Sequence, residues 1–384
     1  MRDPGQHILY LATEYDAPGM RPYARNIINT LWQDGDHILI VSRYSPDSEA
    51  FPDIPSDAVT WIDYPTSKWT KAVFRFRPTR VLHAIKDICV RCGISLIYSL
   101  TEELILTDSI CSLQRSVPVL YTVHDARFHD YKAGNPIRWL KNRYILARPQ
   151  RLMLERTTLQ VTNSSDQQEY IKQRYPGHKV HYVPFPTLVN DAITRGGQQV
   201  AELTDVKDGY ILFFGTLHKY KGVQQLYETY LSHPELQDRP LVIAGSQRIY
   251  FERSANERNV IFINRFVNDN ELRDLFSRAA VVVYPYISAT QSGVASIASY
   301  FGKPMVLSDL PFFTQTCSGY HGVEFYANGD NEALARAIVC CLKSAGDSCT
   351  LYRDVFSPEA LSSALDNIIG TILVESSSNT YIEK

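Results

Sequence analysis

The sequence predicts an α/β protein with two doubly wound parallel-sheet domains. Short apolar runs of strand length alternate with amphipathic helical segments; the alternation breaks near residue 190 and then begins again. Strands separated by helices of this length pair in parallel, because the crossover helix returns the chain to the same end of the sheet. The 384 residues are enough for two domains of ordinary size.

The first series occupies residues 1–190, which we expect to form an N-terminal Rossmann-like domain. The expected helix 21–33 carries Ile27, Ile28 and Leu31 on one face, and Asp34-Gly35-Asp36 ends it. The expected strands are 7–12, 37–42, 95–98, 118–123 and 158–163, and a second helix is expected at 81–90.

The second series follows a polar segment, 191–208, that we expect to be a linker. Residues 209–357 are expected to form the C-terminal domain. Residues 358–384 are expected to form a last helix with a loose polar tail from residue 375. A return of this helix to the N-terminal domain is one alternative. The expected strands are 210–214, 241–244, 260–263, 281–284 and 304–308, and the expected helices are 223–231, 269–278, 292–301 and 332–344.

Composition excludes some functional classes. The formal net charge is −2, which disfavours a dedicated nucleic-acid binder. No apolar run approaches the ~18 residues of a membrane span, and the first residues lack a secretory pattern. Cys89 and Cys92 have metal or redox spacing, but free thiols in a reducing compartment account for an odd number of cysteines. We therefore expect a cytoplasmic protein.

One segment of the N-terminal half is locally basic. Between Asp130 and Glu155 the chain has no acidic residue, and cations alternate with aromatic and apolar residues. This surface is a candidate for binding an anionic molecule or the inner face of a membrane. The alternative is a solvated helix with long side chains. The candidate residues are Arg138, Lys141, Arg143, Arg148 and Arg151.

A glycine-bearing loop, 215–222, joins the expected strand 210–214 to the next helix. Loop amides and a helix N-terminus point at an anion in such a joint, and a lysine adds a full positive charge, so the pattern is typical of phosphate binding. An ordinary strand–loop–helix joint with surface lysines is the alternative. The candidate residues are Gly215, Thr216, His218, Lys219 and Lys221.

A second loop follows the expected strand 281–284. Small hydroxyl residues and a glycine allow a phosphate or sugar to approach the backbone closely. Ser292 is equally suited to be a plain helix N-cap. The candidate residues are Thr290, Gln291, Ser292, Gly293 and Val294.

The apolar strand 118–123 ends in His124 and Asp125. The carboxyl end of a strand is where a doubly wound sheet presents functional side chains. A structural histidine is the alternative.

Taken in order, these segments resemble the glycosyltransferases of the GT-B fold, specifically the retaining family four (glycosyl transferases group one). The resemblance runs from about residue 7 to residue 338, and its order and spacing are more specific than any single motif. The matching segments are Ala17-Pro18-Gly19, Val123-His124-Asp125, Gly215 with Lys221-Gly222, Ala244-Gly245 and Gly302-Lys303-Pro304-Met305-Val306.

The sequence departs from the family at three polar anchors. The two family glutamates would fall at Ala289 and Ile297, and the arginine that holds the diphosphate is replaced by Thr216. The stretch 289–293 resembles a Thr-Gln-Ser-Gly variant of the family. In that variant Thr290, Gln291 and Ser292 are candidates for the sugar and phosphate contacts, and His218, Lys219 or Arg265 for the missing cation.

The resemblance implies sugar transfer, with retention, from a UDP- or GDP-linked donor in a cleft between the domains. Lys221 and the two loops would stabilise the leaving diphosphate, His124 would position the donor sugar, Asp125 would orient His124, and Gly19 and Gly245 would line the donor site. It implies no cofactor and no metal. The acceptor would be a glycan or a lipid-linked oligosaccharide in surface polysaccharide biosynthesis, and the basic segment 132–156 would be the surface that meets it. A catalytically silent nucleotide-binding subunit and an epimerase or hydrolase of the same fold remain alternatives.

Overall fold

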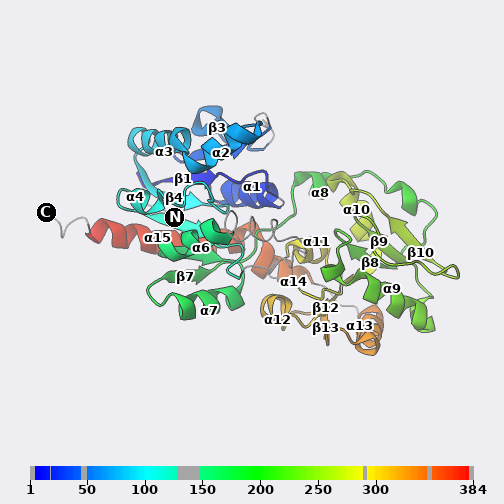
Figure 1. The fold of residues 1–384 in the computed structure, drawn as a ribbon. Helices are drawn as coiled ribbons and strands as arrows, with labels where there is room; N and C mark the ends of the chain where they lie inside the picture. Colours follow the sequence, from blue (N-terminus) through cyan, green and yellow to red (C-terminus); the bar gives the residue numbers. More distant parts are fainter. Residues whose placement is uncertain are drawn as a thin grey trace. The chain divides into compact units, whose positions relative to one another are not determined.

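The computed structural model describes residues 5–17, 19–44, 50–127, 147–288, 292–343 and 348–379. The chain divides into two compact units, one formed by 1–186 with 361–384 and the other by 187–360. Each unit contains one parallel sheet with helices packed against it (Figure 1). The predicted fold class, two parallel-sheet α/β domains, is confirmed.

The sheet of the first unit has seven strands in the order β3-β2-β1-β4-β5-β6-β7. All neighbouring strands are parallel, so their carboxyl ends share one edge. The strand order reverses between β1 and β4, which makes that pair the switch point of the sheet. The strands are β1 (His7–Ala12), β2 (His37–Ser42), β3 (Val59–Asp63), β4 (Ile94–Ser99), β5 (Val119–Thr122), β6 (Leu159–Thr162) and β7 (Lys179–Tyr182).

Successive strand residues point to opposite faces, and each face has its own core. Helices α1 and α15 cover one face, where Tyr10 and Ile38 pack with Ile27 and Leu365. Helices α3, α4, α6 and α7 cover the other face. The helices are α1 (Met20–Leu31), α2 (Lys68–Phe76), α3 (Thr79–Arg91), α4 (Ile110–Gln114), α6 (Arg148–Arg156), α7 (Ser165–Arg174) and α15 (Pro358–Asn379), with a 3-10 turn at Ser56–Ala58.

The sheet of the second unit has six parallel strands in the order β10-β9-β8-β11-β12-β13, and its order reverses between β8 and β11. The strands are β8 (Tyr210–Phe214), β9 (Leu241–Ala244), β10 (Val260–Ile263), β11 (Ala279–Tyr284), β12 (Met305–Ser308) and β13 (Val323–Tyr326). The helices are α8 (Asp191–Arg195), α9 (Val223–Ser232), α10 (Asp269–Ser277), α11 (Val294–Tyr300), α12 (Pro311–Cys317), α13 (Asn331–Lys343) and α14 (Cys349–Leu351). Shorter turns lie at Ala201–Leu203, Lys219–Lys221, Pro234–Leu236 and Tyr352–Phe356.

The segment expected as a linker, 191–208, belongs to the second unit. It forms α8 and a 3-10 turn, and it buries Ile193, Val200 and Leu203 in the core of that unit. Helix α15 continues through Asn379, so the residues from 375 to 379 are helical rather than a loose tail. Three strands, β3, β7 and β13, were not predicted.

Within the described ranges, no helix is long and apolar enough to cross a membrane. All seven cysteines are free thiols, Cys89 and Cys92 among them. The same ranges contain no group of three or more side chains placed to hold a metal ion.

Helix α15 is separated in sequence from the rest of the first unit, yet it supplies Leu365, which is fully buried. We expect Leu365→Ala to destabilise the first unit by about 2–5 kcal/mol, because it removes buried methyl groups and leaves a cavity. Val374→Ala in the same helix is the control, since Val374 is 62% exposed and its truncation should change stability by no more than about 0.5 kcal/mol. Urea unfolding followed by circular dichroism measures both, and equal effects would contradict the assignment of α15 to this core.

Candidate functional site

The candidate site of the second unit lies at the carboxyl edge of its sheet. Strands β8 and β11 are neighbours there and flank the switch point, where ligands of open α/β sheets bind. The loop 215–222 follows β8, and the loop that begins at Pro285 follows β11. Both predicted loops therefore leave the sheet side by side.

Gly222 holds these two loops together. It has φ 65°, and a Cβ atom at this position would lie 1.7 Å from the carbonyl oxygen of Pro285. No residue with a side chain fits, because both the backbone conformation and the contact exclude a Cβ. The Ile287 amide also donates to the Tyr220 carbonyl oxygen at 2.7 Å. The close approach places Lys221 directly against the second loop.

The Lys221 side chain is buried, with 8% of its surface exposed. Its Nζ donates to the Tyr286 hydroxyl at 2.8 Å and lies 4.7 Å from the centre of the Tyr286 ring. The Tyr286 hydroxyl is in turn 3.4 Å from Ser292 Oγ. Within the described part of the chain, no carboxylate contacts Lys221. A buried ammonium with only neutral partners is costly, so an anion is the partner that this site lacks.

Two further glycines make room for this ammonium. A Cβ on Gly215, whose φ is 146°, would lie 3.2 Å from Lys221 Nζ. A Cβ on Gly245, after β9, would lie 1.8 Å from the Gly215 carbonyl oxygen. The Leu217 amide donates to the Ser246 carbonyl oxygen at 2.9 Å and fixes the two loops. Backbone therefore packs on backbone around Lys221, with Thr216 half-buried beside it.

The other predicted donor residues are less tightly held. His218 stacks on Tyr220 with ring centres 5.8 Å apart, and both residues are exposed, as is Lys219. Ser292, Gly293 and Val294 are buried where α11 begins. Thr290 and Gln291 lie outside the described residues. Gly19, in the first unit, precedes α1 with φ 81° and would have no neighbour within 4 Å of an added Cβ.

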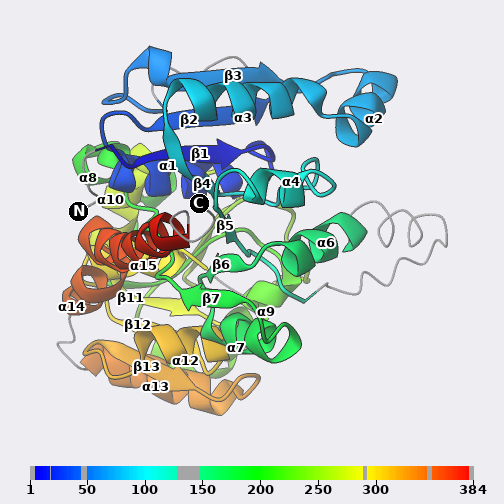
Figure 2. The ribbon, with the colours of Figure 1, turned by 90° about the vertical axis from the view of Figure 1, so that its left-hand side faces the viewer.

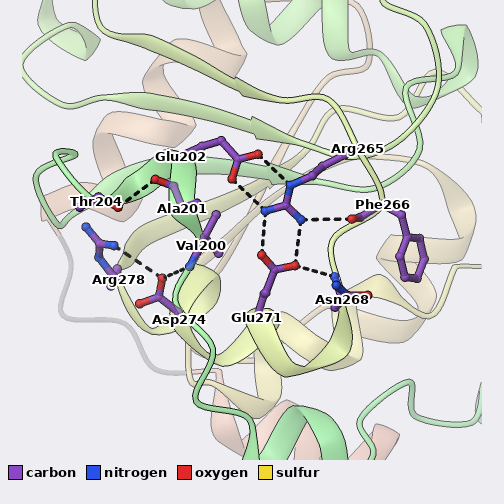
Figure 3. A network of polar contacts seen from close by, with 10 residues as sticks. All are labelled: Val200, Ala201, Glu202, Thr204, Arg265, Phe266, Asn268, Glu271, Asp274 and Arg278. Atoms are coloured by element: carbon purple, nitrogen blue, oxygen red, sulfur yellow. Dashed lines mark hydrogen bonds and ion pairs between the residues drawn. The ribbon is translucent and has the colours of Figure 1, made fainter.

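Arg265 is held by two glutamates of its own unit (Figure 3). Its Nε and Nη2 donate to Glu202 at 2.7 and 2.8 Å, and its Nη1 and Nη2 donate to Glu271 at 2.8 and 2.7 Å. Nη1 also donates to the Phe266 carbonyl oxygen at 3.2 Å. All five N–H groups of the guanidinium are thus in use. The hydrogen bonds raise the pKa of Arg265 and lower those of both glutamates. Arg265 joins the turn 201–203 to α10, and it presents no unused donor to a diphosphate.

His124 is buried at the end of β5. Its Nε2 is 2.9 Å from the Leu100 carbonyl oxygen, an acceptor only, so Nε2 carries the proton. Burial lowers the pKa of His124 and favours the neutral ring, which packs edge-on against Tyr23 at 4.7 Å. The neighbouring Asp125 is half-buried, and its carbonyl oxygen accepts from Gln150 Nε2 at 3.3 Å. The described contacts of His124 therefore hold β5 beside β4.

Three glutamates, which the sequence reasoning missed, lie at the switch point of the first sheet. Glu14 follows β1, and Glu102 and Glu103 follow β4. Burial raises the pKa of Glu14 and of Glu102 to about 7, and that of Glu103 to about 8. The signal was present in the sequence, because acids directly follow two strands that a doubly wound sheet places side by side.

These glutamates differ in their partners. Glu103 is fully buried and is bound by the Thr13 amide at 3.4 Å, by the Thr13 hydroxyl and by the Thr101 hydroxyl at 3.0 Å. Glu102 accepts from Gln150 Nε2 at 2.6 Å. The half-buried Glu14 carboxyl accepts no hydrogen bond from a described residue. Carboxyl groups that change protonation near neutral pH can both donate to and accept from the hydroxyls of a polyol.

Most of the predicted basic surface lies outside the described residues, Arg138, Lys141 and Arg143 among them. Arg148 and Arg151 are exposed on α6, and Arg151 pairs with Glu155 at 3.6 Å.

The second unit matches a known protein family, and the whole chain is similar to solved structures. Residues 208–344, which contain the Lys221 loop and the switch point of the second sheet, match the family model of Glycosyl transferases group 1. Among solved structures, sucrose-phosphate synthase from Thermosynechococcus elongatus is similar with a TM-score of 0.66 at 17% identity, over 96% of this chain and 100% of that one. The chain has the GT-B fold.

Two other GT-B structures show the same similarity. HepE from Anabaena, in complex with UDP and glucose, has a TM-score of 0.65 at 16% identity over 95% of this chain and 100% of its own. An alpha,alpha-trehalose-phosphate synthase (UDP-forming) from Burkholderia vietnamiensis has 0.64 at 13% identity, over 96% and 99%. At these identities the likeness concerns the fold. A search of curated protein sequences found no match.

Glu103 makes stability depend on pH. Its pKa of about 8 in the folded chain exceeds the usual 4.5, so the folded state binds the proton more tightly. Stability should therefore fall as pH rises from about 5 to about 8, and level off above that. We expect Glu103→Gln to flatten this slope and to raise the melting temperature at pH 8. Glu169→Gln, at an exposed position of α7, is the control and should leave the slope unchanged. Thermal unfolding across this pH range would contradict the assignment if Glu103→Gln kept the wild-type slope.

Proposed function

We propose that this chain is a glycosyltransferase that moves a sugar, with retention, from a UDP-linked donor to a hydroxyl group of a glycan or lipid-linked acceptor. The observation that carries the proposal is the buried Lys221 ammonium, which has no anionic partner in the described part of the chain and lies at the switch point of the second sheet. The match of residues 208–344 to Glycosyl transferases group 1 supports the reaction class.

In this proposal Lys221 binds the diphosphate. The bond from the sugar C1 to the diphosphate oxygen breaks, and the departing oxygen gains negative charge that Lys221 stabilises. A bond forms between C1 and the acceptor oxygen, and the hydroxyl proton leaves with the diphosphate or to solvent. Tyr286 keeps the ammonium in place through its hydrogen bond of 2.8 Å. Retention is inferred from the resemblance to the retaining family four.

The UDP assignment rests on proteins of the same fold. HepE was solved with UDP-glucose, and the trehalose-phosphate synthase is UDP-forming. We propose the acceptor at the carboxyl edge of the first sheet, where the Glu14 carboxyl accepts no hydrogen bond from a described residue. A setting in surface polysaccharide biosynthesis rests on the family resemblance alone.

A second candidate is a nucleotide-binding subunit without turnover. One of the two family glutamates would fall at Ile297, and this side chain is 2% exposed in the core of the second unit. An apolar residue there removes an anchor for the donor. Incubation with UDP-glucose and an acceptor glycan, followed by detection of UDP, separates the candidates, because only the transferase releases UDP in proportion to product.

Lys221→Met provides the sharpest test, because it keeps the apolar stem of the side chain and removes the charge. In the absence of ligand we expect the variant to melt at a higher temperature than the wild type, since a buried unpaired ammonium is costly. We expect UDP to raise the melting temperature of the wild type but not of the variant. Transfer should fall by about 10²–10³-fold in kcat.

The control is Lys207→Ala, an exposed lysine of the same unit, which should keep the UDP shift and the turnover. A UDP shift that survives in Lys221→Met would remove Lys221 from the donor site.

A further inference from the structure

Helix α2 exposes its apolar side. Trp69 is 79% exposed, Phe76 78% and Val73 49%. At about 100° per residue these three positions fall within about 60° of one another, so they share one face of the helix. An ordinary surface helix turns such a face toward the core. Here the face is open to solvent, which is typical of a surface that is covered by a partner.

The opposite side attaches α2 to the carboxyl edge of the first sheet. Phe74 packs edge-on against Tyr64 at 5.4 Å, and Arg43 lies over the Tyr64 ring at 5.1 Å. Burial raises the pKa of Glu14, and Arg75 lies close enough to oppose part of that rise. Ser67 Oγ accepts from the Thr70 amide at 3.1 Å and caps the helix. Figure 2 shows α2 beyond the tip of the β3 arrow, at an edge of the first unit.

The segment that carries this face is basic. From Lys68 to Lys86 the sequence has six cations and no acidic residue. Arg77, directly after α2, and Arg80, in the first turn of α3, are both exposed. Exposed aromatic side chains with cations beside them are typical of helices that lie in the interface of an anionic bilayer. The rings enter the headgroup region, and the long cationic side chains reach the phosphates.

We propose that α2 and the residues up to Arg80 dock the protein on an anionic lipid surface, with Trp69, Val73 and Phe76 in the interface and the cations on the headgroups. A second copy of the chain fits less well. An isologous contact through α2 would place the cations of one copy against those of the other. The proposal does not depend on the proposed reaction, since it rests on α2 alone.

Sedimentation with lipid vesicles tests the proposal. We expect the full chain to bind vesicles of phosphatidylcholine and phosphatidylglycerol, to bind pure phosphatidylcholine vesicles weakly, and to dissociate from the anionic vesicles as salt increases. Trp69→Ser with Phe76→Ser should reduce binding by about tenfold or more, because both rings leave the interface. Arg77→Glu with Arg80→Glu should reduce binding to the anionic vesicles alone.

Phe266→Ser is the matched control, because Phe266 is a 71% exposed aromatic residue of the second unit. It should bind vesicles as the wild type does. Trp69 gives an independent readout. Vesicles should shift the tryptophan emission of the wild type to shorter wavelength, and Trp69→Phe should remove that shift.

Three results would overturn the proposal. The first is no binding of the wild type to the anionic vesicles, and the second is unchanged binding of the Trp69→Ser, Phe76→Ser variant. The third is a wild-type dimer in light scattering that this variant abolishes, which would assign α2 to self-association. The UDP-induced melting shift of this variant distinguishes failure of the docking proposal from failure of the proposed function, since α2 and Lys221 belong to different units.

Discussion

The burial of the Lys221 ammonium is the constraint on which the second unit depends. Gly222 brings the loop after β8 against Pro285, Gly215 leaves space for Nζ, and Gly245 lets the loop after β9 reach the Gly215 carbonyl oxygen. The backbone contacts of Gly222 and Gly245 exclude a Cβ atom, and the positive φ of Gly215 favours glycine, so three glycines shape the loops around one charged group. A chain that needed only a stable joint would bury an apolar side chain here at lower cost. This geometry therefore fits the diphosphate that we propose as the ligand.

Most strands were predictable from the sequence, and three of the four edge strands were not. The fourth edge strand, β10, was predicted at 260–263 because it is a continuous apolar run. Strands β1, β2, β8, β9 and β11 are buried on both faces and appear as continuous apolar runs. Strands β3, β7 and β13 lie at sheet edges, where several residues are half-buried or exposed. Their polar positions break the apolar run that identifies a strand. The segment 191–208 looked like a linker for a similar reason, because only Ile193, Val200 and Leu203 reach the core.

The candidate site was predictable where it depends on neighbours in sequence. The glycine-bearing loop predicted Lys221 as a phosphate-binding cation. That role stays a prediction, and the structure shows the residue buried in the turn Lys219–Lys221 before α9. Arg265 was a reasonable cation by position, but Glu202 lies 63 residues away and takes two of its hydrogen bonds. No local pattern shows such a pairing. Glu14 and Glu103 were missed because their proximity follows from the strand order β1-β4, which the sequence analysis did not apply to them.

Each unit buries an ionisable side chain at the switch point of its sheet, an acid in the first unit and a base in the second. Glu103 is buried at the switch point of the first sheet with hydroxyl and amide partners, and its carboxyl is neutral below about pH 8. Lys221 is buried at the switch point of the second sheet with a hydroxyl partner. A carboxyl group can lose its charge by binding a proton, which keeps the first unit stable without a ligand. The Lys221 ammonium has only neutral partners among the described residues, and a bound anion would offset the cost of its burial. Ligand-dependent stabilisation should therefore arise in the second unit, and pH-dependent stabilisation in the first.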